Sequence, residues 1–434
     1  MKIKSIIILC AACALLLGAC RSNPHYNPAK PHHTEDGFRN NYPHAPPESF
    51  WKWQWQRWTR GVPENPEGGY GFTLLKPDAG FLGANRAEPT LTWIGHASFL
   101  LQIGGVNVLT DPHLTERASP VAFAGPKRHV SPALDFDNLP HADVVVISHS
   151  HYDHLDLQTV KQLNRQKGGA PLFLVPLGLK AWFKAQDIDD VTELDWWDST
   201  SFKGLKLTLA PVQHWSARTP WDRNKTLWGS WVIEHPELRF YFGGDFGYSA
   251  DLADIGRRFG PIDLAALPIG AYEPRWFMQV MHVNPEEAVR AFRDLRARYA
   301  VAMHWGTFRL TDESLDEPPR RLAQVLSDSG VSPERFFVMM HGQMRKLDFL
   351  RRTEGNVAAP TAAGTSRRKT CAHLGHFARW PTRFGSRTLS TAPQCGHGTA
   401  IGVISQPLRC ESQPSHPTRR RERCQREHFD GRVR

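Results

Sequence analysis

The stretch SHSHYDHLD at residues 148–156 constrains this chain more than any other segment. It follows directly on the apolar residues 144–147, where four consecutive β-branched side chains leave no polar face and so predict a buried strand. Four side chains able to bind a metal therefore lie where this strand ends. They are His149, His151, Asp153 and His154. Imidazole and carboxylate are ligands that zinc and similar cations prefer, so we interpret the stretch as a metal site rather than as a solvated polar loop.

The spacing within the motif divides it in two. His149 and His151 are two apart in extended chain, so they point to the same side. Asp153 and His154 come at the turn into a helix that we expect over residues 157–163, so they can serve a second ion.

Three other side chains have the same placement after a strand. The apolar segments 205–209, 239–242 and 299–303 predict strands, and a potential ligand follows each of them. In chain order these ligands are His214, Asp245 and His304. We expect them to gather with the motif at one edge. Strands that alternate with helices, without a long run of either, favour a layered α/β domain.

Six segments in all resemble one protein family. Besides HSHYDH they are WIGHASFLLQ (93–102), LTDPH (109–113), GGDFGYS (243–249), MHVNPEEAV (281–289) and AMHWGTFRLTDE (302–313). They resemble the metallo-β-lactamase superfamily, and within it the group of N-acylphosphatidylethanolamine-hydrolysing phospholipases D. The resemblance covers about residues 50–350 and implies a four-layer αββα sandwich with a dinuclear centre.

The same resemblance implies how the ligands divide between two zinc ions, although other divalent transition metals accept this ligand set. One ion would be held by His149, His151 and His214, the other by Asp153, His154 and His304, and Asp245 would bridge them. The two ions would share a hydroxide and polarise a substrate oxygen. The family implies a phospholipid-like substrate, whose diester would be cleaved to phosphatidic acid and an N-acylethanolamine.

Several residues in or near these segments are candidates for supporting roles. Asp111 is either a partner of a ligand imidazole or a turn-capping residue before Pro112. His96 is either a lining residue or a buried structural histidine. His282 is our preferred proton donor to the leaving group, and Tyr248 is the alternative.

Arginines in loops that flank these segments are candidates to bind the substrate phosphate. A guanidinium can hold a phosphate through two parallel hydrogen bonds, although surface arginines are usually solvated. We expect the substrate-binding residues to be Arg218, Tyr248 and Arg275, with Arg223 as a further cation.

The N-terminus predicts export. Lys2 and Lys4 precede an apolar segment at 6–17, which is short for a membrane span, and Leu17-Gly18-Ala19-Cys20 resembles a bacterial lipobox. We expect a signal peptide over residues 1–19 and a lipid anchor on Cys20. The protein would then lie in the bacterial envelope and face the periplasm, and we favour the outer membrane over the inner membrane. The alternative is an ordinary secretory peptide.

Composition divides the chain after the signal peptide into three segments. The proline-rich residues 20–49 predict an extended tether, residues 50–350 the hydrolase domain, and residues 351–434 a disordered basic tail. That tail holds 16 Lys and Arg against 5 Asp and Glu, so it accounts for the net charge of +10. The domain is close to neutral, which argues against a nucleic-acid partner.

Two questions stay open at this level. In a helix, Trp51, Trp55 and Trp58 share one face, which would either meet lipid headgroups or pack on the domain. The metal ligands also suit a lactonase, an amidase or a β-lactamase acting on a carbonyl. A third hypothesis is a non-enzymatic envelope scaffold that keeps the fold.

Overall fold

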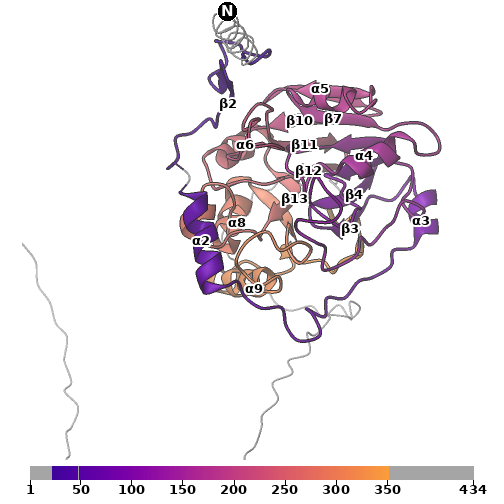
Figure 1. The fold of residues 1–434 in the computed structure, drawn as a ribbon. Helices are drawn as coiled ribbons and strands as arrows, with labels where there is room; N and C mark the ends of the chain where they lie inside the picture. Colours follow the sequence, from indigo (N-terminus) through magenta and orange to yellow (C-terminus); the bar gives the residue numbers. More distant parts are fainter. Residues whose placement is uncertain (1–21, 47, 351–434) are drawn as a thin grey trace, which may run out of the picture. The chain divides into compact units, whose positions relative to one another are not determined.

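The computed structural model describes residues 22–46 and 48–350. In this part of the chain two seven-stranded sheets face each other across a shared core, and helices cover their outer faces (Figure 1). This is the αββα sandwich expected from the sequence.

Each sheet is formed mostly by one half of the domain. The first has, in spatial order, β16 (Met344–Lys346), β3 (Thr90–Gly95), β4 (Ser98–Ile103), β5 (Val106–Thr110), β6 (Val144–Val146), β7 (Leu172–Pro176) and β8 (Val191–Leu194). The second has β15 (Phe336–Phe337), β14 (Ala297–Met303), β13 (Ile262–Pro268), β12 (Leu238–Phe242), β11 (Ser230–His235), β10 (Leu205–Ala210) and β9 (Ser199–Phe202).

The helices form the two outer layers. Apolar side chains of α3 (Ala79–Ala84), α4 (Leu157–Asn164) and α5 (Leu179–Lys184) share a core with the first sheet. Those of α6 (Asp251–Phe259), α8 (Pro285–Asp294) and α9 (Glu317–Ser329) belong to the core of the second. The short helices α2 (Phe50–Arg60) and α7 (Arg275–Met278) lie outside these layers and pack on each other.

Burial on both faces explains the unbroken apolar run before the motif. Val144 and Val146 point into the core between the sheets, whereas Val145 and Ile147 join the core beneath α4. Because both faces are covered, no position along β6 tolerates a polar side chain. The strand begins at the predicted residue and ends one residue earlier than predicted.

Strand directions bring the loops of interest to one edge. β5, β6 and β7 are parallel to one another, and so are β12, β13, β14 and β15. β3 is antiparallel to β4 and β4 to β5, so β3 runs with β5; in the same way β10 runs with β12. We call the edge at which β3, β5, β6, β10, β12, β13 and β14 end the carboxyl edge.

At two positions the backbone geometry agrees with what the local sequence favours. Gly104 and Gly105 both have positive φ, 57° and 76°, and connect β4 to β5 as a two-residue hairpin turn. Asn284 caps α8, and its capping box with Glu287 satisfies backbone N–H groups at the start of the helix.

The segment expected to be a tether is folded in part. It forms a small hairpin of β1 (His33–Thr34) and β2 (Gly37–Phe38). Asp195, which follows β8, accepts hydrogen bonds from Nε2 of His32 at 2.7 Å and Nε2 of His33 at 2.9 Å, and pairs with Lys30. This buried carboxylate holds the segment on the domain together with Phe38, whose side chain joins the core and whose N–H donates to the carbonyl of Asn224 at 2.9 Å.

Other N- and C-terminal predictions lie outside the described residues: the signal peptide (1–19), the anchor at Cys20 and the basic tail (351–434). Among the residues that the structure describes, no helix is long and apolar enough to cross a bilayer.

Candidate metal centre

Three imidazoles converge at the carboxyl edge. Nδ1 of His151 lies 2.8 Å from Nε2 of His149 and 3.3 Å from Nε2 of His214. His149 and His151 come from the loop after β6 and His214 from the loop after β10, so the group joins the two sheets. Three ring nitrogens directed at one another are the arrangement that a single cation would occupy.

A second group lies beside the first. Oδ2 of Asp153 is 3.3 Å from Nε2 of His154 and 3.3 Å from Nε2 of His304. All three side chains are largely buried, and His304 reaches the group from the loop after β14.

Asp245 lies between the two groups. Its Oδ2 is 3.1 Å from Nε2 of His154 and 3.9 Å from Nε2 of His149, and its Oδ1 is 3.1 Å from Nε2 of His304. One carboxylate thus reaches imidazoles of both groups. Oδ1 of Asp245 and Nε2 of His154 are buried without a hydrogen-bond partner among the described residues. Bound cations would satisfy such atoms, so the donor set fits two metal ions.

Outer partners fix which nitrogen of each ring faces the centre. Nδ1 of His154 donates to Oδ2 of Asp111 at 2.6 Å, and Nδ1 of His214 donates to the carbonyl of Met281 at 2.9 Å. Oγ of Ser148 donates to Asp111 at 2.5 Å and lies 2.8 Å from Nδ1 of His149. In each case Nε2 is the nitrogen directed at the centre, where a cation would bind.

The electrostatics suit the same role. Burial lowers the pKa of His149 and His214 well below its ordinary value, and that of His151 to about 4, so these rings are neutral and keep a lone pair.

The carboxylates beside them behave in the opposite way. Burial alone would raise the pKa of Asp153 and Asp245, but the adjacent His154 outweighs it and holds both pKa values well below the usual range. In return these carboxylates, Asp245 above all, outweigh burial and raise the pKa of His154 well above its ordinary value and that of His304 to about 9. A cation that binds these two rings would therefore displace a proton, and the ionised carboxylates attract it.

Comparisons with known proteins agree with this geometry. Residues 106–305 match the family model described as beta-lactamase superfamily domain. Over 246 residues the chain is 44% identical to N-acyl-phosphatidylethanolamine-hydrolyzing phospholipase D 1 of Caenorhabditis elegans, a match that covers 54% of this chain and 69% of that protein. The chain belongs to the metallo-β-lactamase superfamily, in the group of these phospholipases.

Two further relatives support the assignment. The mitochondrial N-acyl-phosphatidylethanolamine-hydrolyzing phospholipase D of Saccharomyces cerevisiae is 34% identical over 264 residues, which cover 59% of this chain and 56% of that protein. A metal-dependent hydrolase of Methanopyrus kandleri is 29% identical over 255 residues, which cover 56% of this chain and 99% of that protein. The protein is therefore a metal-dependent hydrolase of this superfamily.

Two histidines left open by the sequence lie at the centre. Nε2 of His96 donates to Oδ2 of Asp153 at 2.9 Å, and its ring lies 4.1 Å from that of His304. His96 thus orients a carboxylate of the second group. His282 has its Nδ1 3.8 Å from Oδ2 of Asp245, with 14% of its side chain exposed, so it lies where the centre opens to solvent.

The structure places each of the predicted substrate-binding residues in contact with other protein groups. The hydroxyl of Tyr248 donates to Asp294 in the last turn of α8, away from His282, which precedes the first turn. Arg218 donates to the carbonyls of Ser150 and Leu155, both at 2.8 Å, so it braces the motif loop.

The guanidinium of Arg275 is also hydrogen-bonded to protein groups. It donates to the carbonyl of His282 and to Glu287, each at 2.8 Å. Arg223 differs: its guanidinium lies over Trp215, 4.0 Å from the ring centroid, and it has no hydrogen bond or ion pair among the described residues. Trp215 in turn packs against His151. Arg223 is therefore the arginine of this region that remains available to an anion.

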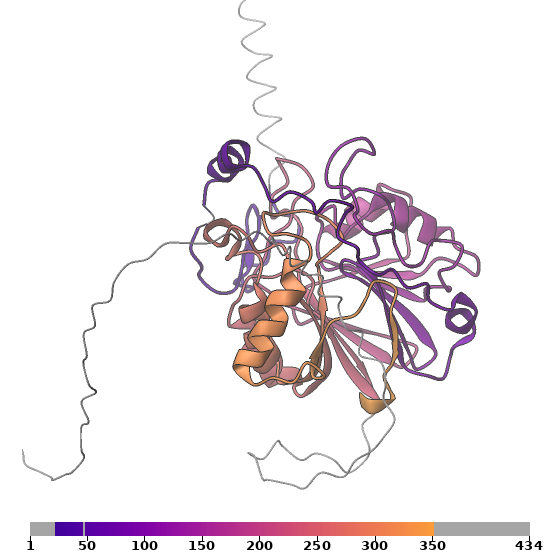
Figure 2. The same cartoon turned by 90° about the horizontal axis from the view of Figure 1, so that it is seen from below.

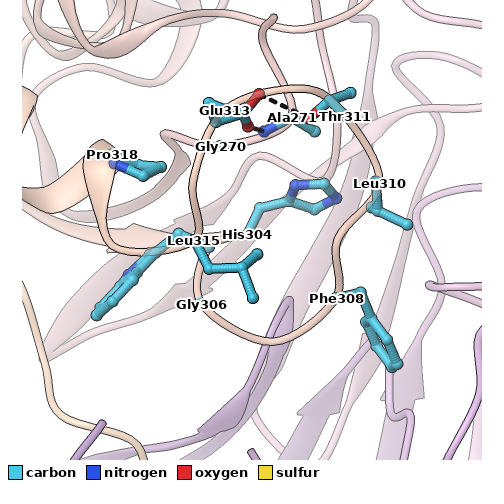
Figure 3. Close-up of a pocket in the computed structure, with 11 residues that line it drawn as sticks. Gly270, Ala271, His304, Gly306, Phe308, Leu310, Thr311, Glu313, Leu315 and Pro318 are labelled. Carbon is cyan, nitrogen blue, oxygen red and sulfur yellow. Dashed lines mark hydrogen bonds between the residues drawn. The ribbon is translucent and has the colours of Figure 1, made fainter. Parts of the chain in front are cut away.

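Sequence reasoning missed two residues that hold the loops of the centre. Asn40 exchanges two hydrogen bonds with the backbone of His214, at 3.0 and 3.1 Å. Glu313 accepts from the backbone N–H of Ala271 at 2.6 Å and from the hydroxyl of Thr311 at 2.8 Å, and so ties together the loops that line a small pocket beside His304 (Figure 3). Asn40 lies in no pattern that distinguishes it from other polar loop residues, whereas Glu313 ends the segment 302–313 that resembles the family, which could have indicated a role for it.

Proposed function

We propose that the protein is a dinuclear zinc hydrolase that cleaves the phosphodiester of N-acylphosphatidylethanolamine-like lipids. The observation that carries the dinuclear part is the position of Asp245 between two groups of imidazoles. The phospholipid substrate is supported by the activity for which the nematode and yeast relatives are named.

The candidate ligands form two sets, one for each cation. His149, His151 and His214 would hold one ion, Asp153, His154 and His304 the other, and Asp245 both. When bound, two divalent cations lower the pKa of a water molecule and neutralise charge on a phosphoryl oxygen. The chain supplies the orientation, because Asp111, Ser148 and the Met281 carbonyl fix the ring tautomers.

His282 is placed to assist the leaving alcohol. Its Nδ1 has no hydrogen-bond partner among the described residues, and its side chain is in part accessible from solvent. Burial lowers the pKa of His282 to about 4, against the opposing effect of Asp245, so the ring is neutral at pH 7. Its contribution is then a hydrogen bond donated to the leaving oxygen.

Arg223 favours phosphorus over a carbonyl as the reacting centre. A guanidinium without a protein partner, stacked on Trp215 beside His151, suits an anionic diester. A simple lactone carries no charge that requires it, whereas a β-lactam with a carboxylate does not differ from the diester in this respect. We therefore keep the lactonase, amidase or β-lactamase as the alternative that the experiment must exclude.

The test measures hydrolysis of N-acylphosphatidylethanolamine, a simple lactone and a β-lactam by the zinc-loaded protein. Asp245→Ala and a chelated sample should lose activity, and metal content is measured in each. Asp254→Ala is the matched control, because this carboxylate lies on α6 and pairs with Arg257 and Tyr42.

Release of N-acylethanolamine that disappears with Asp245→Ala and with chelation is the expected result. Turnover of only the lactone or β-lactam would move the substrate to the acyl class. No turnover of any substrate, with two metals bound, would favour the non-enzymatic scaffold.

We also propose that the protein is lipid-anchored through Cys20 in the bacterial envelope and faces the periplasm. The lipobox-like Leu17-Gly18-Ala19-Cys20 supports this. Mass spectrometry of the mature N-terminus tests it: an unmodified Cys20, or cleavage elsewhere, would contradict the anchor.

A further inference from the structure

The helix α2 presents most of its tryptophans to solvent. Trp53 is only 6% exposed and stacks on Phe277, whereas Trp51, Trp55 and Trp58 are 78%, 62% and 76% exposed. The sequence left two hypotheses for the tryptophans of this helix: packing on the domain, or contact with lipid headgroups. Packing on the domain explains only Trp53. Single apolar residues on a protein surface are common and need no explanation. Three exposed tryptophans on one short helix form a larger apolar patch, and such a patch marks an interaction surface.

Two further exposed aromatic residues come from other loops of the carboxyl edge. Phe123, 83% exposed, lies between β5 and β6, in the loop that begins with Asp111. Trp221, 84% exposed, lies between β10 and β11, in the loop that carries His214. Among the residues that the structure describes, every large apolar side chain at least 62% exposed belongs to α2 or to these two loops.

The helix itself is fixed to the same edge. Trp53 packs on Phe277 in α7, after β13, and its Nε1 donates to Asp312, after β14, at 2.8 Å. Figure 2 shows α2 (indigo) on the side of the sandwich from which the long loops project. We call Trp51, Trp55, Trp58, Phe123 and Trp221 the aromatic rim.

The charge around the aromatic rim identifies the partner. The helix Phe50–Arg60 contains no Asp or Glu. Of its three cations, Lys52 pairs with the exposed Glu48 at 3.6 Å and Arg57 with Asp312 at 3.3 Å, so Arg60 is the one without an ion pair among the described residues. Arg223 adds an unpaired cation beside the metal centre. Tryptophan together with Lys and Arg is the combination that lies at the headgroup level of a bilayer, where the rings enter the interface and the cations meet anionic lipids.

We propose that the aromatic rim is a membrane-docking surface that places the carboxyl edge against a bilayer containing anionic phospholipids. The inference deepens the proposed function and rests on it for its biological purpose, because the diester of such a substrate lies at the headgroup level. Docking spares the enzyme the cost of withdrawing three acyl chains into water before the diester reaches the metal centre.

Tryptophan emission provides a direct test with the full chain. The first tryptophan of the sequence is Trp51, so quenching by lipids brominated near the headgroup does not report on the N-terminal apolar segment. Vesicles of brominated phosphatidylcholine and phosphatidylglycerol should quench the wild-type protein. The triple variant Trp51→Ala, Trp55→Ala, Trp58→Ala should lose at least half of this quenching.

The matched control removes an exposed aromatic residue from the opposite edge. Phe349 follows β16, whose last residue pairs with Thr90 at the start of β3. Phe349→Ala should keep wild-type quenching. Because the three tryptophans of the triple variant are exposed, the fold should survive, and circular dichroism checks this.

Activity separates docking from catalysis. The triple variant should hydrolyse a short-chain, water-soluble analogue within about twofold of wild type, and lose about tenfold with substrate in vesicles. Quenching without hydrolysis of either substrate would leave docking standing and contradict the proposed function.

Other results would overturn the docking proposal. Equal quenching of wild type and triple variant is one. Absence of quenching, with a dimer that the triple variant turns into a monomer, would show that a second copy covers the aromatic rim. Absence of quenching with a monomer in both would show that the chain covers it itself.

Discussion

Asp111 accepts a hydrogen bond from Nδ1 of His154 at 2.6 Å, and both side chains are fully buried. The same carboxylate accepts from the backbone N–H and the hydroxyl of Ser148, so it orders the start of the metal motif from the loop after β5. Its position connects two strands of the first sheet to a ligand whose ring must present Nε2 to the centre.

Asp111→Asn should therefore weaken metal binding more than it weakens the fold. The amide keeps the size of the carboxylate but loses the charge that stabilises the proton on Nδ1, and the affinity for the ion held by His154 should fall about 10–100-fold. Competition with a chromogenic chelator measures this. Asp254→Asn, a change on α6 outside the centre, should leave affinity unchanged; equal losses in both variants would contradict a specific role for Asp111.

The convergence of the candidate metal ligands was predictable from sequence because each follows a buried strand. That placement needs only the apolar pattern of residues 144–147, 205–209, 239–242 and 299–303 and the rule that such strand ends gather. The four-layer fold came instead from the resemblance of whole segments.

The neighbours of the ligands were not predictable. Arg218 and Arg223 lie five residues apart in one loop, yet one braces backbone carbonyls and the other is free of protein partners; only tertiary contacts separate them. The strand β13 (Ile262–Pro268) was also missed, because its Ala-rich sequence lacks a strand pattern. Its state is fixed by pairing with β12 and β14 on either side.

Asn40 offers a test of whether the N-terminal segment supports the centre. Asn40→Ala removes two hydrogen bonds to the backbone of His214, so the ligand loop should become more mobile and the first ion should dissociate several-fold faster. Asn41→Ala is the matched control, because Asn41 bonds Asp251 on α6 instead. Stopped-flow transfer of metal to a chelator distinguishes the two. The same rate in both variants would show that Asn40 only attaches the segment.

The hold of Asp195 on residues 22–38 should depend on pH. Burial opposes ionisation, but hydrogen bonds from His32 and Lys30 outweigh it, and the pKa of Asp195 lies well below its usual range. A carboxylate with a lowered pKa contributes stability that is complete above its unfolded value, about 3.9, and that is lost as the pH falls through the folded value. Protection factors for the amides of residues 22–38, which remove the intrinsic pH dependence of exchange, should therefore be high at pH 7 and fall only below about pH 4. Asp195→Ala should exchange fast at both pH values, whereas Asp36→Ala, in the exposed turn of the hairpin, should match wild type.

The contrast between Arg218 and Arg223 yields a paired prediction. Arg218→Met leaves the carbonyls of Ser150 and Leu155 without their donor, and should lower the free energy of unfolding by about 2 kcal/mol. Arg223→Met removes a cation that lies on Trp215, and should leave stability within about 0.5 kcal/mol because it breaks no hydrogen bond to the protein. Chemical denaturation measures both. In turnover of a soluble phosphodiester, Arg223→Met should raise KM with little change in kcat, since a charge that binds the ground and transition states alike affects KM alone. An unchanged KM would show that the phosphate is held elsewhere, and an Arg223→Met protein as unstable as Arg218→Met would show that both arginines are structural.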